Sequence, residues 1–237
     1  MDSFPCSSCK KECLSELIGT YMLVLIGPAS VILLSLISLS GLGALASIAL
    51  AFGGTVALMI LALGRYSGSV INPAVLIAVA SAKLLKKELI VPYLVFQIAG
   101  GILAGLTLRF LFLSSINSTQ LGSTKLATGI SPILGIAFEA IGTFVLASSA
   151  LIASTRIKKT KYQALLVGST LSILILFLGP LTGAGFNPAR SLGPSFASGY
   201  FTNLEVYIIG PVIGALFAGL LFRMVRNYGK RNLVCLC

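Results

Sequence analysis

Long apolar runs dominate the chain, and polar residues fall mostly between them. A helix needs roughly 20 apolar residues to cross the hydrocarbon core of a bilayer. Six runs reach about this length, and the pattern therefore predicts six transmembrane helices. The predicted spans cover residues of about 14–37, 42–64, 89–113, 131–153, 162–180 and 204–225.

Two shorter apolar pieces follow the second and the fifth span. They are "INPAVLIAVASA" (71–82) and "FNPARSLGPSFA" (186–197), each about half the length that crosses a bilayer. Asn is a favoured helix N-cap and Pro is favoured at the first helical position, so each piece is predicted to start a helix inside the membrane. Irregular backbone at that depth is tolerated only where it is buried in protein or lines water. The two pieces are therefore predicted to be re-entrant half-helices beside a hydrated cavity.

Composition supports the membrane interpretation, because 57% of the residues are hydrophobic and only 10% are charged. The net charge of +11 would suggest a nucleic-acid partner in a soluble domain. Here the cations flank the apolar runs, so we expect membrane lipid as their surroundings and no nucleic acid. The protein is expected to be an all-α integral membrane protein.

The basic residues fall on one side of the predicted membrane. Of the 17 Lys and Arg residues, all except Arg109, Lys125 and Arg190 lie on the side that carries both termini. Cytoplasmic loops are enriched in Lys and Arg. The sequence therefore predicts a multi-pass protein of the cell membrane with both termini in the cytoplasm.

The two halves of the chain match each other in three places and in the same order. Because each half contains three spans, an odd number, the halves must cross the membrane in opposite directions, as in many transporters and channels. We expect a single domain over 1–237, with repeats of about 14–113 and 131–225 and tails of 1–13 and 226–237. The matches are "ELIGTY" (16–21) with "EAIGTF" (139–144), "SGSVINPA" (67–74) with "TGAGFNPA" (182–189), and "YLVFQIAGGILAG" (93–105) with "YIIGPVIGALFAG" (207–219).

The paired Asn-Pro-Ala motifs, the Glu-x-x-Gly-Thr that opens each half and the "NPARS" of the second half resemble the aquaporin (major intrinsic protein) family over nearly the whole chain. The resemblance implies six transmembrane helices with two half-helices in an inverted 3+3 repeat. It also implies a homotetramer with one pore per subunit, a passive channel rather than an enzyme, and no cofactor. The motif residues are Asn72, Pro73, Ala74, Asn187, Pro188 and Ala189.

The physics of these motifs predicts that water passes and protons do not. Each helix N-terminus carries roughly half a positive charge, so two that meet repel cations. The side-chain oxygens of Asn72 and Asn187 are expected to cap the two half-helices. Their NH₂ groups are then expected to donate hydrogen bonds into the lumen. A water molecule held by both amides cannot take part in a continuous proton wire.

The narrowest ring of the pore is placed by the resemblance. Arg190 directly follows the second motif, and the family pattern places the other ring positions at Phe52, Ile175 and Ala184. Water-restricted members carry a His at the fifth-span position, whereas this chain contains no His at all. Glycerol facilitators carry an Asp after the arginine, where Ser191 stands here. The pattern is most similar to archaeal and intermediate aquaporins, so we expect water first, with glycerol, hydrogen peroxide and dissolved gases as further candidates.

Two acidic residues and one glutamine within the predicted spans also need an explanation. Glu16 and Glu139 are costly inside a bilayer unless they face the protein interior. We expect each carboxylate to accept hydrogen bonds from a re-entrant loop, and Gln97 to do similar work; a proton-coupling role is the alternative. We expect the five cysteines to be free thiols that bind no metal, with acylation or a redox pair as alternatives. They are Cys6, Cys9, Cys13, Cys235 and Cys237.

Two rival classes make different demands on the sequence. A secondary transporter on the same inverted scaffold needs a coupling acid near the midplane, and none is evident beyond Glu16 and Glu139. An intramembrane enzyme needs a base or an acid dyad, but Asp2 is the single Asp and there is no His. The "NST" at 117–119 on the predicted outer loop leaves glycosylation of Asn117 open.

Overall fold

The computed structural model describes residues 7–234, which form helices and connecting segments without a strand. All six predicted spans are present as helices long and apolar enough to cross a membrane. The two predicted half-helices are present as well. The spans are α1 (Ser7–Leu36), α2 (Gly41–Ser67), α4 (Ile90–Leu111), α6 (Pro132–Arg156), α7 (Thr160–Thr182) and α9 (Val206–Val234), and the half-helices are α3 (Pro73–Ser81) and α8 (Pro188–Ser198).

The bounds differ from the expected ones by a few residues at most ends. The largest local addition is in the connection between α4 and α6, where the apolar pattern predicts no element. It contains the single turn α5 (Ile116–Thr119) between the 3-10 turns η2 (Leu113–Ser115) and η3 (Gln120–Gly122). Another 3-10 turn, η1 (Lys87–Leu89), leads into α4.

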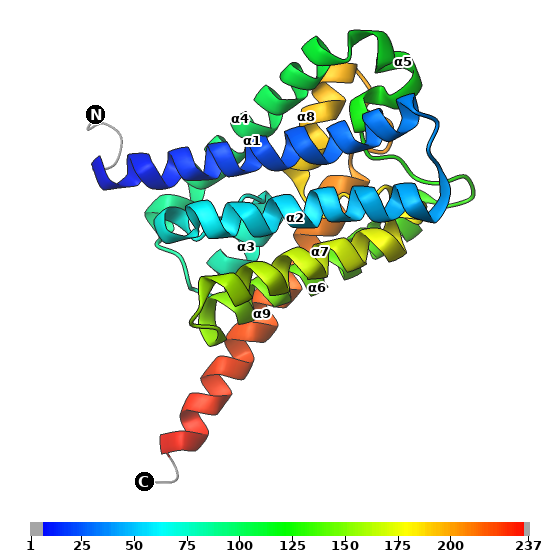
Figure 1. Cartoon of the computed structure of the whole chain (residues 1–237). Coiled ribbons are helices and arrows are strands. Elements are labelled where there is room, and N and C mark those ends of the chain that lie inside the picture. Colours follow the sequence, from blue (N-terminus) through cyan, green and yellow to red (C-terminus); the bar gives the residue numbers. More distant parts are fainter. Residues whose placement is uncertain (1–6, 235–237) are drawn as a thin grey trace.

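The two halves are intertwined, because the half-helix of each half lies against the long helices of the other (Figure 1). In the first half α1 packs against both α2 and α4, in the second half α6 packs against both α7 and α9, and α2 packs against α7 across the two halves. Each half-helix packs most extensively on the last long helix of the other half, α8 on α4 and α3 on α9. The described ends of α1 and α9 lie on the same side of the molecule (Figure 1).

Glycines allow the closest helix crossings. A Cβ added to Gly53 of α2 would lie 2.3 Å from the carbonyl oxygen of Gly168, and one added to Gly168 of α7 would lie 2.6 Å from that of Gly53. The contact of α8 with α4 is equally tight, since a Cβ on Gly193 would lie 2.1 Å from the carbonyl oxygen of Gly101. Small residues are what permit such backbone approach between membrane helices.

Candidate functional site: a pore between the half-helices

Both half-helices begin in the interior with an asparagine cap. Asn72 has extended backbone, and its Oδ1 accepts from the N–H of Ala74 at 2.8 Å and of Val75 at 3.4 Å. Asn187 does the same with Ala189 at 3.0 Å and Arg190 at 3.3 Å. The first helical residue is Pro in each case (Pro73 and Pro188), which needs no partner for an N–H.

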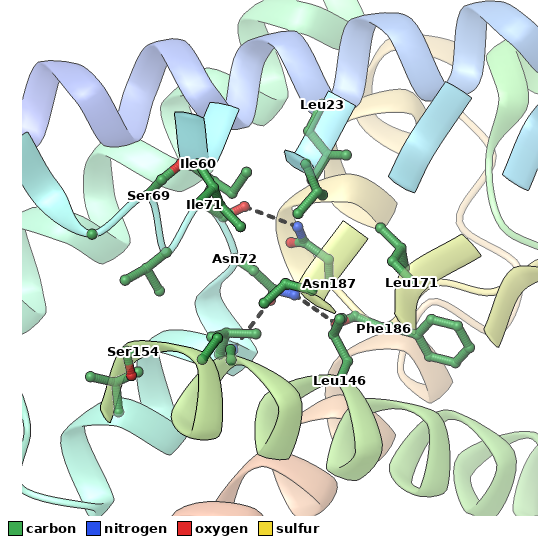
Figure 2. Close-up of a pocket in the computed structure, with 18 of the residues that line it drawn as sticks. Leu23, Ile60, Ser69, Ile71, Asn72, Leu146, Ser154, Leu171, Phe186 and Asn187 are labelled. Carbon is green, nitrogen blue, oxygen red and sulfur yellow. Dashed lines mark hydrogen bonds between the residues drawn. The ribbon is translucent and has the colours of Figure 1, made fainter. Parts of the chain in front are cut away.

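The amide groups of the two caps reach across to the opposite loop. Nδ2 of Asn72 donates to the carbonyl oxygen of Phe186 at 2.9 Å, and Nδ2 of Asn187 donates to that of Ile71 at 3.1 Å (Figure 2). The expectation that both amides are free to serve the lumen is therefore too simple. An amide carries two N–H donors, so each asparagine keeps one for a passing molecule while the other fixes the facing loop.

A buried carboxylate holds each loop from behind. Oε1 of Glu16 accepts from the Ser67 hydroxyl at 2.6 Å and the Val70 N–H at 2.9 Å. Its Oε2 accepts from the Ile71 N–H at 2.6 Å and from Nε2 of Gln97 at 2.7 Å. The loop contacts are the ones expected for Glu16. Gln97 differs from the expectation, because it donates to the carboxylate of Glu16 and not to the loop.

Glu139 repeats the arrangement in the second half. Its Oε1 accepts from the Thr182 hydroxyl at 2.7 Å and the Gly185 N–H at 2.9 Å, and its Oε2 accepts from the Phe186 N–H at 2.7 Å. In the repeat match the position of Gln97 is taken by Pro211, which has no amide to offer. Glu16 therefore accepts from a fourth donor, the Gln97 amide, that Glu139 lacks.

The loops need this support because their backbone is strained. Residues with a Cβ rarely adopt positive φ, and branched ones least of all. Ile71 has a φ of 43° and Phe186 a φ of 50°, and Ser69 and Ala184 share the left-handed region. Alternation of this kind turns successive N–H groups toward the carboxylate and leaves the other face of the loop to the lumen.

The repeated glycine of Glu-x-x-Gly-Thr has a role that the sequence analysis missed. A Cβ on Gly19 would lie 2.4 Å from Cγ2 of Ile71, and one on Gly142 would lie 2.2 Å from Cε1 of Phe186. Each glycine thus makes room for the residue directly before an Asn-Pro-Ala motif. The signal that could have found it is the occurrence of glycine at matched positions of the two repeats.

Two cavities lie along the axis between the halves. The first, of about 300 Å³, extends from Ser154 and Gln163 near the α6–α7 connection to the paired asparagines and beyond them. The second, of about 340 Å³, opens toward Lys125 in the connection between α4 and α6. The two cavities share only the residues Phe52, Ala184 and Arg190.

The shared residues mark the place where the cavities meet. Arg190 is 4% exposed, its Nη1 donates to the carbonyl oxygen of Gly122 at 2.9 Å, and its Cζ lies 5.0 Å from the centroid of the Phe52 ring. Ile175, the fourth predicted ring position, lines the second cavity but not the first. The structure therefore brings Phe52, Ala184 and Arg190 together and places Ile175 on the side of the second cavity.

The rest of the first cavity has mostly apolar walls. Leu23, Leu146 and Leu171 surround the asparagine pair, while the Phe186 ring points away from it (Figure 2). Among the described residues, no Asp or Glu lines either cavity, and no group of acids and cysteines could hold a metal ion. The formal charges that described residues bring to the lining are those of Arg190 and Lys125.

Membrane-spanning helices around two cavities that meet at a cationic constriction define a membrane channel. A family model described as "Major intrinsic protein" matches residues 4–222. The chain belongs to this family, whose members are passive channels for water and small solutes and not enzymes.

Relatives from distant sources align over most of their length. The chain is 34% identical to aquaporin AqpM of Methanothermobacter thermautotrophicus, an alignment that covers 93% of this chain and 99% of that one. It is 33% identical to nodulin-26 of Glycine max over 93% of this chain and 79% of that one. The structure of the aquaglyceroporin from Plasmodium falciparum shares the fold, with a TM-score of 0.75 at 24% identity over 96% of this chain and 99% of that one.

Proposed function

We propose that the pore between α3 and α8 conducts water, and with it small neutral solutes, down their gradients while it excludes protons and ions. The observation that carries this proposal is the meeting of two half-helix N-termini at Asn72 and Asn187, in a lumen lined by no described carboxylate. An uncharged solute meets hydrogen-bond donors there without a binding acid that would retain it.

Exclusion of cations follows from the charges around the meeting point. Each half-helix N-terminus contributes roughly half a positive charge, and Arg190 adds a full one next to α8. The remaining N–H of each asparagine orients a water molecule by its oxygen, so that this molecule cannot relay a proton between its neighbours. A hydronium ion meets both the electrostatic barrier and the broken proton wire.

The solute range is set, in this proposal, by the ring of Phe52, Ile175, Ala184 and Arg190. Ile175 offers an apolar wall where an imidazole would add a donor and take up space, and Ala184 has the smallest side chain. Glycerol can then present its hydroxyls to Arg190 and its carbon backbone to Phe52 and Ile175. This combination supports passage of small polyols beside water.

Further parts of the proposal concern the assembly and its orientation. We place the protein in the cell membrane with both termini in the cytoplasm, because of the one-sided distribution of Lys and Arg. The exposed apolar side chains of the long helices suit lipid and neighbouring subunits. The family resemblance favours a homotetramer with one pore in each subunit, built from one channel domain.

Stopped-flow light scattering on proteoliposomes tests this function. Vesicles that contain the protein should shrink faster than empty ones after an impermeant osmolyte is added, and should re-swell faster in a glycerol gradient. Water flux equal to that of empty liposomes would contradict the channel. Water flux without glycerol flux would narrow the proposal to water, and solute flux driven by a pH gradient would favour a transporter.

A further inference from the structure

One glycine outside the repeated motifs lies directly against the constriction. A Cβ added to Gly27 of α1 would lie 2.2 Å from Cε1, 2.4 Å from Cζ and 2.5 Å from Cδ1 of Phe52. No Cβ atom lies this close to a carbon of another side chain, so the aromatic ring occupies the space that any other residue at position 27 would fill.

The same ring forms a wall of the pore. Phe52 is 4% exposed, lines both cavities and lies with its centroid 5.0 Å from Cζ of Arg190. Its position relative to α1 therefore fixes how far it reaches toward Arg190. A methyl group on Gly27 would move the ring away from α1, in the direction of the lumen that it lines.

The second half of the molecule lacks this arrangement. In the register that matches Glu16 with Glu139, Gly27 corresponds to Ala150, and in the register that matches Asn72 with Asn187, Phe52 corresponds to Val167. Gly19 and Gly142, by contrast, are glycine in both halves. The recess at Gly27 is thus not part of the repeated scaffold, and it lies behind a residue that lines both cavities.

We propose that Gly27 is a positioning residue of the constriction, which seats the Phe52 ring against α1 and so sets the largest solute that passes Arg190. This inference rests on the proposed channel function. It assigns solute selection partly to the first helix, which contributes no residue to the ring itself.

Four variants in proteoliposomes test the proposal: Gly27→Ala, Phe52→Val, the double variant, and Gly54→Ala as the matched control. Gly54 is also helical, but a Cβ there meets nothing within 4 Å. We expect Gly27→Ala to reduce glycerol flux roughly tenfold, the order that an overpacking barrier produces, and to reduce water flux less. If the wild type passes water alone, the same loss is expected in water flux.

The double variant distinguishes positioning from a general loss of structure. Val at position 52 removes the ring atoms that the new methyl would strike, so the double variant should recover the flux of Phe52→Val alone. If the double variant yields folded protein and Gly27→Ala does not, that result would also support a clash between the new methyl group and the Phe52 ring.

Three outcomes would overturn the proposal. They are flux in Gly27→Ala equal to that in Gly54→Ala, loss of flux that Phe52→Val does not rescue, and failure of both Gly27 variants to fold. A wild-type protein without water flux would contradict the proposed function itself. That failure can be distinguished from failure of the Gly27 proposal, because it is seen in the comparison of wild-type vesicles with empty ones, which involves no variant.

Discussion

Glu16 and Glu139 are fully buried, and each accepts hydrogen bonds from a hydroxyl and two backbone N–H groups of one re-entrant loop. The loops contain Ile71 and Phe186 at positive φ, a conformation that persists only where the surroundings impose it. The carboxylates supply that constraint, and a transport role for them is not needed to explain their burial.

Replacement of Glu139 by Gln should destabilise the protein. Both carboxylate oxygens of Glu139 accept hydrogen bonds. In the Gln variant one of these oxygens is replaced by an NH₂ group, which faces the same donors and cannot accept from them. We expect a loss of about 1–3 kcal/mol in the free energy of unfolding, the usual cost of an unsatisfied buried partner. Thermal unfolding of the purified protein in detergent measures it.

The matched control is Glu205→Gln, which removes the same charge at an exposed position directly before α9. Equal melting temperatures for the two variants would show that the loop does not depend on the carboxylate.

A second prediction for single residues concerns Ile175 in the proposed selectivity ring. Ile175→His adds a polar side chain to the wall of the second cavity, and should reduce glycerol flux more than water flux because the apolar surface for the carbon backbone is lost. Ile175→Leu keeps the apolar volume and serves as the control. Unchanged glycerol flux in the histidine variant would place the selective position elsewhere on α7.

Single residues were predictable where a motif or a symmetric match pointed to them. Asn72, Asn187, Glu16 and Glu139 all belong to repeated segments, and the carboxylate contacts follow from the need to satisfy loop backbone inside a membrane. The contact of Gly27 with Phe52 could not be predicted, because it depends on the distance and rotation between α1 and α2. The crossed amide bonds were missed for a similar reason, since they require the two loops to face each other.

The half-helices α3 and α8 have complementary caps at their two ends. Their N-termini meet at the asparagines, and their C-termini each receive an arginine from the last helix of a half. Arg109 of α4 donates through Nη1 to the carbonyl oxygen of Ala197 at 2.6 Å, and Arg226 of α9 donates through Nη2 to that of Ala82 at 3.0 Å. A cation at a helix C-terminus satisfies free carbonyls and the helix dipole together.

Arg226→Met should therefore loosen α3 without a change in the lumen. The loss of a partly exposed charge-assisted hydrogen bond predicts a decrease of about 1–2 kcal/mol in the free energy of unfolding. Faster hydrogen exchange in the last turn of α3 would locate the effect, with exposed Lys158→Met as the charge-matched control. If exchange in α3 is the same in both variants, the arginine cap is not significant.

The elements themselves were largely predictable. Apolar length alone located the six spans, and Asn-Pro located the starts of both half-helices, because lipid leaves the backbone few alternatives to a helix. The two largest differences are at the polar ends of the chain, where α1 begins at Ser7 instead of about 14 and α9 ends at Val234 instead of about 225. The turns between α4 and α6 could not be found in this way. They lie outside the apolar runs, and their short helical pieces depend on packing against the ends of neighbouring helices.

The whole molecule combines a symmetric scaffold with an asymmetric lumen. Helix packing, loop support and asparagine caps obey the inverted repeat, whereas Phe52, Arg190 and the recess at Gly27 have no counterpart in the other half. Symmetry brings two helix N-termini to one point, and the proposed exclusion of protons depends on that meeting. Selection among neutral solutes needs only one narrow ring, so it can depart from symmetry without a cost to the scaffold.

The most direct test of a proton-excluding pore is simultaneous measurement of water and proton movement in the same proteoliposomes. An osmotic step read by light scattering reports water, and a pH-sensitive dye inside reports protons under an imposed pH gradient. The account predicts water flux well above that of empty vesicles, with a weak temperature dependence and the same slow pH change as in empty vesicles. Water flux at the level of empty vesicles, or rapid entry of protons together with water, would contradict it.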